Sequence, residues 1–150
     1  MLARALTVAA VLGVTAVVVA PLAITSGQAV VSIAAAGIYA AGARVCHQRP
    51  DRCFWIHGRP MPVCARCTGL YAGAAVAASF VLVSGLGGLS SRRARRIAAI
   101  AALPTLITWG LEAAGLAHPS NVVRVVAALP LGFAAAGLVI ATLARRARRL

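Results

Sequence analysis

The sequence is short of charge, and of negative charge above all. It has no lysine, and Asp51 and Glu112 are the two acidic residues among 150 positions. Charged residues make up 11% of the chain and aromatic residues 5%, whereas a soluble globular domain has about 25% charged residues. An ordinary soluble domain is therefore excluded. Fifteen arginines give a net charge of +13, but no basic face with interleaved aromatic residues exists, so we predict no nucleic-acid partner.

What the chain has in abundance is apolar sequence. Hydrophobic residues make up 61% of it, in runs of about 20 residues, the length that crosses a ~30 Å hydrocarbon layer. We predict an all-α integral membrane protein that forms a single membrane domain over 1–150 and whose partner is the lipid bilayer. Its four transmembrane helices are expected at about 6–24, 68–89, 97–117 and 122–143.

Two apolar ranges allow more than one interpretation. The first run, 6–24, could be a signal peptide cleaved near Gly27, but its length favours an uncleaved anchor. The range 28–44 is rich in Ala and Gly, which gain little from lipid. We therefore predict that it is an interfacial or re-entrant helix that does not cross the membrane.

The second predicted span has two local signals at its start. Thr68 is a residue type that caps helix N-termini. Gly69 and Gly73 form a GxxxG pair, which allows close approach of another helix. In a chain so rich in Ala and Gly this pair also arises easily by chance.

Clustered arginines set the predicted topology. Two groups lie two spans apart, on one side of the membrane, and the positive-inside rule makes that side cytoplasmic. They are Arg92, Arg93, Arg95 and Arg96, and Arg145, Arg146, Arg148 and Arg149. With both termini cytoplasmic in a plasma-membrane protein, the segment 46–67 is extracytoplasmic. Five scattered arginines around that segment oppose this orientation.

The segment 46–67 is a Cys/His-rich loop with all four cysteines and two of the three histidines. Its prolines and Gly58 predict turns rather than a long helix. Two spans separate it from the turn 118–121, so both lie on one face. Glu112 and Arg124 reach that face too, where they are plausible partners of each other.

The cysteine spacing indicates a metal site. Cys64 and Cys67 form a CxxC pair, and Cys46 and His47 lie about eighteen residues upstream, a spacing similar to that of zinc ribbons. These four residues are the predicted zinc ligands. Cys53, His57 and His118 are the alternates. A c-type haem is excluded because Thr68 follows the CxxC where histidine is required.

Two other chemistries stay open. The first is a membrane thiol–disulfide oxidoreductase, with Cys64–Cys67 and Cys46–Cys53 as the most local pairs. The second is an enzyme acting on an anionic lipid or another small anionic ligand, held by Arg52, Arg66 and Arg124. No nucleophile–base pair identifies a reaction, and nothing indicates the oligomeric state.

The same residues resemble those of a known family. Cys46-His47-Gln48, Arg52, the run from Pro62 to Gly73 that contains CARCTG, and Asn121-x-x-Arg124 are similar to a family of small prokaryotic membrane proteins. That family is catalogued as domain of unknown function 2085, and the resemblance covers about 21–137. It implies a small helical membrane protein of no known activity. Its signature residues include Cys46, His47, Gln48, Arg52, Cys64, Arg66, Cys67, Asn121 and Arg124.

The chain departs from the family pattern at two positions. Cys53 stands where the family more often has Ser, which makes Cys53 doubtful as an essential ligand. Trp109-Gly110 stands where Asp-Gly is common, and Glu112 could replace that acid. The other polar signature residues, together with Glu112, are the predicted supporting or anion-binding residues. They are Gln48, Arg52, Arg66, Glu112, Asn121 and Arg124.

Overall fold

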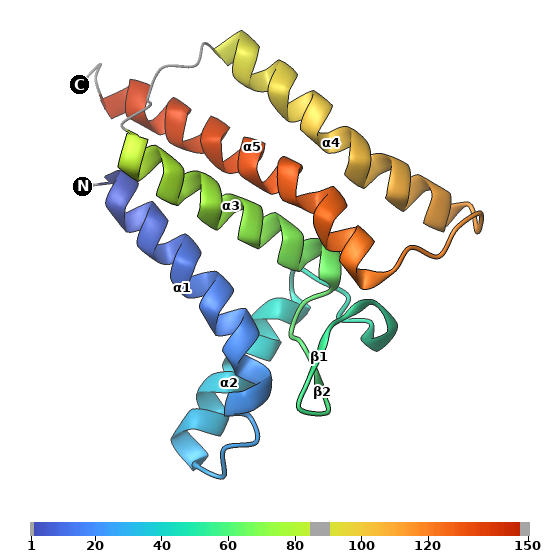
Figure 1. The fold of residues 1–150 in the computed structure, drawn as a ribbon. Coiled ribbons are helices and arrows are strands. Elements are labelled where there is room, and N and C mark those ends of the chain that lie inside the picture. Colours follow the sequence, from blue (N-terminus) through green and yellow to red (C-terminus); the bar gives the residue numbers. More distant parts are fainter. Residues whose placement is uncertain (1, 85–90, 148–150) are drawn as a thin grey trace.

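In the described part of the chain, four long helices lie side by side in the order α1, α3, α5, α4 (Figure 1). The computed structural model describes residues 2–84 and 91–147. The helices are α1 (Leu2–Ala23), α3 (Ala65–Ser84), α4 (Ser91–Ala113) and α5 (Asn121–Ala147). The central helix α3 packs against α1 and α5, and α5 also packs against α4. The start of α1 and the end of α5 lie at one end of this layer, and the segment 44–64 that precedes α3 lies at the other (Figure 1).

Three described helices are long and apolar enough to cross a membrane. They are Arg4–Ala23, Arg92–Ala113 and Asn121–Ile140, which correspond to the first, third and fourth predicted spans. The predicted span 68–89 corresponds to α3, which begins three residues earlier, at Ala65. The described part of α3 is not among the three helices that meet the length and hydropathy criteria for crossing. Residues 85–89 of that prediction lie outside the described residues. The fold is thus that of a mostly helical membrane protein.

The predicted boundaries of the third span are wrong at both ends. α4 begins at Ser91, so Arg92, Arg93, Arg95 and Arg96 lie in its first turns instead of forming a connection. It ends at Ala113 rather than 117. Gly115 has φ +70°, and Leu116 N–H donates to Leu111 O at 2.9 Å. This is the hydrogen bond of a glycine-terminated helix end.

The short helix α2 (Ala29–Ala43) extends beyond the end of α1 (Figure 1). Its 15 residues span only about 22 Å at 1.5 Å per residue, less than the hydrocarbon thickness. The structure therefore has a short apolar helix where the sequence predicts one that does not cross.

The segment between α2 and α3 is turns and one small hairpin. A 3-10 turn, η1 (Pro50–Arg52), precedes β1 (Trp55–Ile56) and β2 (Arg59–Pro60), which pair antiparallel. His57 and Gly58 form the connection with φ +48° and +73°. Positive φ at both positions is typical of a two-residue hairpin turn. The predicted loop 46–67 is too long by three residues, because Ala65, Arg66 and Cys67 belong to α3.

Glycines let the α3 and α5 backbones touch. A Cβ at Gly69 or Gly73 would collide with the Val125 or Leu129 carbonyl oxygen of α5, and one at Gly132 would collide with the Leu70 carbonyl oxygen of α3. The GxxxG prediction is confirmed in this respect. These contacts fix how α3 lies on α5, and so where its first turn points.

Candidate functional site

Three thiols gather at the start of α3. One sulfur each from Cys46, Cys64 and Cys67 lies within 4.8 Å of the other two. Zinc–sulfur bonds of about 2.3 Å in tetrahedral geometry put two sulfurs about 3.8 Å apart. The three sulfurs are therefore within about 1 Å of the spacing that one ion requires, and a metal ion could be held here.

The helix start arranges two of these thiols. Thr68 N–H donates to Cys64 O at 2.9 Å as the first helical bond, so Cys64 is the N-cap residue of α3. The prediction that Thr68 is the cap is wrong, and its hydroxyl instead donates to Cys64 O at 3.2 Å. A helix N-terminus presents unpaired N–H groups that favour a negative charge. This is where a thiolate is most easily held.

Cys46 reaches the pair from the end of α2, and Gln48 holds it there. The Gln48 side-chain amide donates to Tyr39 O and to Pro62 O, both at 2.7 Å. The two carbonyls belong to α2 and to the chain just before Cys64. As a result Cys64 N–H donates to Cys46 Sγ at 3.1 Å. Gln48 thus has a positioning role.

The thiol cluster changes the acidity of Cys64. The Cys67 thiol donates a hydrogen bond to the Cys64 sulfur, outweighing the opposing effect of burial, and further donations come from backbone N–H groups and from the Cys46 thiol. Together they lower the pKa of Cys64 from 9.0 to about 5. Burial instead raises the pKa of Cys53 to about 11. Cys64 is therefore a thiolate at neutral pH in the metal-free site.

We expect Cys64 in the metal-free, reduced protein to react with iodoacetamide down to about pH 5. The pKa is lowered on folding, so the stabilisation that this thiolate gives the folded state is complete above pH 9.0 and is lost as the pH falls toward about 5. Peptide-resolved mass spectrometry of alkylation between pH 4 and 10 measures this, with buried Cys53 as the unreactive control. A reaction midpoint near 9 would contradict it.

The other predicted or alternate ligands lie outside the thiol group. His47 is exposed, and it is the one member of the predicted set Cys46, His47, Cys64 and Cys67 that the structure does not place in the thiol group. Cys53 is 1% exposed and separate from the three thiols. His57 lies in the hairpin turn, and His118 is exposed. All four cysteines are free thiols in this structure.

Beside the thiols, one buried carboxylate binds three arginines. Glu112, whose side chain is 5% exposed, lies 2.7 Å from Arg124 Nη2, 2.8 Å from Arg66 Nη1 and 3.2 Å from Arg52 Nε. Three guanidinium groups and one carboxylate leave this cluster with a net charge of +2. Arg66 Nε, Arg66 Nη2 and Arg124 Nε are buried without a hydrogen-bond partner within the described residues. The cluster therefore has donors to spare.

Asn121 joins this cluster to the loop. Its amide donates to Cys53 O at 2.9 Å, and its side-chain oxygen accepts from Arg124 Nη1 at 2.7 Å. Residues three apart share one face of a helix, so Asn121 and Arg124 act together at the first turn of α5. The prediction that the loop and the 118–121 turn lie on one face is confirmed by these bonds.

Thiols and guanidinium groups line one hollow of about 500 Å³. Its wall includes the three clustered cysteines, His47, Gln48, Arg52, Arg66, Leu70, Trp109 and Arg124. The sequence does not indicate that Arg52 and Arg66 would share Glu112 with Arg124. The sequence feature that could have indicated it is the small number of acidic residues, because a single buried carboxylate must then pair with several buried arginines.

These features define a small helical membrane protein with thiols and guanidinium groups gathered at one end of its helices. The chain belongs to the family described as "Predicted membrane protein (DUF2085)", whose sequence profile matches residues 46–138. The matched range includes the thiol cluster, the Glu112 cluster and all but the last residues of the predicted fourth span.

Two archaeal proteins are similar to the chain. An uncharacterized protein of Methanothermobacter thermautotrophicus is 34% identical over 95 residues, which are 63% of this chain and 83% of that protein. An uncharacterized protein of Methanocaldococcus jannaschii is 51% identical over 39 residues, which are 26% of this chain and 25% of that protein. No solved structure matches the chain.

Proposed function

We propose that this protein binds a zinc ion through Cys46, Cys64 and Cys67. The observation that carries the proposal is the approach of these three sulfurs to within 4.8 Å of one another. Thiolate ligands suit zinc. Three thiolates on Zn²⁺ have a net charge of −1, which the neighbouring arginine cluster complements.

The fourth coordination position is open to His47, water or a substrate. His47 lines the same hollow and is exposed, so a change of rotamer could bring it to the ion. Four protein ligands are typical of a structural zinc site, and three ligands with water are typical of a catalytic one. The identity of the fourth ligand therefore distinguishes a structural zinc site from a catalytic one.

We expect the purified protein to contain about one zinc per chain and Cys64→Ser to lose it. Elemental analysis with thiol counting measures this, and Cys53→Ser is the matched control because Cys53 lies outside the thiol group. His47→Ala separates the two kinds of site, since zinc is retained if water is the fourth ligand. A folded wild-type protein that takes up no zinc would refute the proposal.

A second candidate function is thiol–disulfide exchange. The CxxC at the N-terminus of α3 has both sulfurs in the thiol group. In this function the Cys64 thiolate attacks a disulfide of a partner and forms a mixed disulfide. Cys67 then attacks Cys64 and releases the partner. Cys64 and Cys67 are oxidised to a disulfide, and the partner is reduced to two thiols. Metal-free protein whose Cys64–Cys67 pair follows the external redox potential would favour this function.

We further propose that the protein is a multi-pass plasma-membrane protein with the site on the outer face. The exposed arginines at the start of α4 support this, because they lie at the end of the helix layer away from the site. In this arrangement α3 is the fourth crossing helix and both termini are cytoplasmic. Labelling of Cys64 on intact cells by a membrane-impermeant maleimide tests the orientation, and labelling only after lysis would reverse it.

A further inference from the structure

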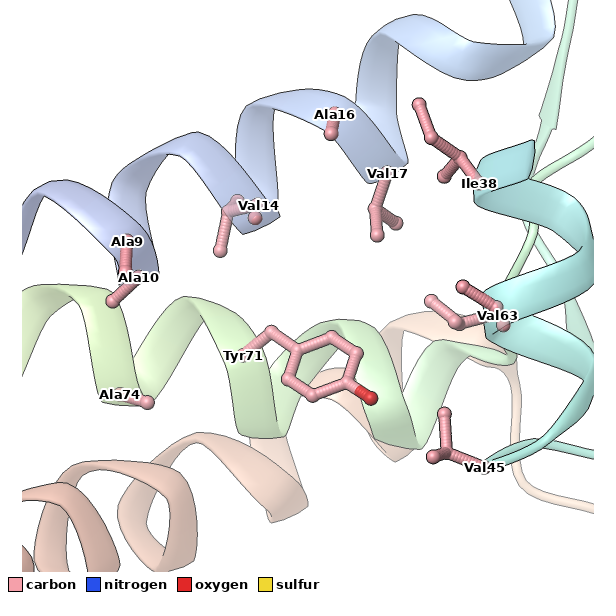
Figure 2. Close-up of a pocket in the computed structure, with 13 residues that line it drawn as sticks. Ala9, Ala10, Val14, Ala16, Val17, Ile38, Val45, Val63, Tyr71 and Ala74 are labelled. Carbon is pink, nitrogen blue, oxygen red and sulfur yellow. The ribbon is translucent and has the colours of Figure 1, made fainter. Parts of the chain in front are cut away.

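An apolar groove adjoins the charged hollow. It has a volume of about 460 Å³ and lies between α1, α2 and α3 (Figure 2). Tyr71 is the one polar side chain among the residues that line it, and its hydroxyl points toward the end where Val45 and Val63 lie. The other lining residues are Ala, Gly, Val and Ile. Such a surface suits a hydrocarbon chain.

The groove and the hollow meet along α3 and at Val45. Val45 lines both. On α3, Cys67 lines the hollow, while Tyr71 and Ala74 line the groove. Positions four and seven residues apart lie on one helix face, so one face of α3 passes from the charged site into the groove. A single molecule with a charged end and an apolar chain could occupy both.

The arginines of the hollow are not ordinary interfacial arginines. Arginines that bind lipid phosphate at a membrane surface extend their heads into water. The Arg66 and Arg124 side chains are instead 13% and 9% exposed. They keep buried N–H groups without partners among the described residues, in a cluster whose buried carboxylate, Glu112, already binds three cations. An anion with several acceptor oxygens in the hollow that Arg66 and Arg124 line would offset the excess charge of this cluster.

We propose that the site binds an anionic lipid whose phosphate contacts Arg66 and Arg124 and whose acyl chain lies in the groove between α1, α2 and α3. This inference goes beyond the zinc site and does not depend on it, because guanidinium groups and apolar side chains hold the ligand. The phosphate would lie beside the three thiols, in the same hollow as the proposed zinc ion.

The test is lipid binding by native mass spectrometry of the full chain in a zwitterionic detergent. The probes are dioleoyl phosphatidate, dioleoyl phosphatidylcholine and glycerol 3-phosphate. We expect one phosphatidate per chain, bound about tenfold or more tightly than the other two. Arg66→Gln removes contacts to the lipid head, and Gly13→Leu places a side chain in the groove at a position where an added Cβ meets nothing within 4 Å. Arg66→Gln should weaken phosphatidate binding about tenfold, the effect of one lost charge-assisted hydrogen bond. Gly13→Leu should weaken it about tenfold as well, the effect of keeping about two CH₂ groups of the acyl chain out of the groove.

Matched variants separate binding from folding. Arg59→Gln removes an exposed arginine of β2 that does not line the hollow, and Gly37→Leu makes the same change as Gly13→Leu on α2, at a position that does not line the groove. Both should bind phosphatidate like the wild type. A measured melting temperature for each variant confirms that it is folded.

Three outcomes would overturn the proposal. Equal binding of the two lipids would mean annular lipid only, and equal binding of glycerol 3-phosphate would mean a small-anion site without a chain site. A second copy of the chain that occupies the groove would make Gly13→Leu change the oligomeric state rather than lipid binding. Phosphatidate binding is measured on zinc-loaded and on chelator-treated protein, so that failure of the lipid proposal can be distinguished from failure of the zinc proposal.

Discussion

Glu112→Gln is expected to lower the free energy of unfolding by about 3–5 kcal/mol, the cost of leaving buried charges without a partner. The amide keeps the shape of the carboxylate but loses its charge. Arg124 and Arg66, which are nearly buried, would then repel each other and Arg52 without compensation. Unfolding of the purified protein in mixed micelles, followed by circular dichroism, measures the change.

Asp51→Asn is the matched control for this prediction. Asp51 also pairs with arginines, Arg49 and Arg52, but its side chain is 58% exposed. Exposed pairs contribute about 0–1 kcal/mol, so this change should be nearly neutral. The double variant Glu112→Gln/Arg124→Gln should regain part of the stability, since it removes one of the uncompensated charges. Equal effects of the Glu112 and Asp51 changes would show that the cluster is not buried as described.

Gly73→Ala is expected to destabilise the protein by about 1–3 kcal/mol, the usual cost of overpacking. The new Cβ would collide with the Leu129 carbonyl oxygen and approach Phe133 N within 2.9 Å. Neither is a flexible side chain that can move aside. α3 and α5 must therefore separate, which also displaces Arg66 on α3 from Glu112.

Gly110→Ala makes the same change in α4 where the added Cβ meets nothing within 4 Å. Alanine favours helix over glycine by about 1 kcal/mol, so this variant should be neutral or slightly more stable. Melting temperatures and zinc content of both variants measure the contrast. If both alanines stabilise the protein alike, the α3–α5 backbone contact is not present in the micelle.

Local sequence predicted the parts of the fold that need no partner. Long apolar runs predicted α1, α4 and α5 because lipid, rather than neighbouring helices, favours them. Helix ends were predicted less well, since they depend on single residues. Gly115 ends α4 earlier than hydropathy alone indicates, and Cys64 starts α3 before the apolar run begins.

The part of the site that local sequence determines was predicted as well. The CxxC spacing places Cys64 and Cys67 together within one helical turn, and the hairpin of α4 and α5 places Glu112 near Arg124. The approach of Cys46 depends on Gln48, whose amide bonds two carbonyls from separate segments. No sequence pattern indicates such a bond.

By itself the sequence determined a helical membrane protein with its ligand-bearing residues on one face, because hydropathy and CxxC spacing are local properties. Only the tertiary structure decided that three thiols meet while His47 and Cys53 lie apart, and that Glu112 binds three arginines. Convergence of side chains from four segments depends on how the helices pack. That packing is set by backbone contact at Gly69, Gly73 and Gly132, which brings the first turn of α3 against the first turn of α5.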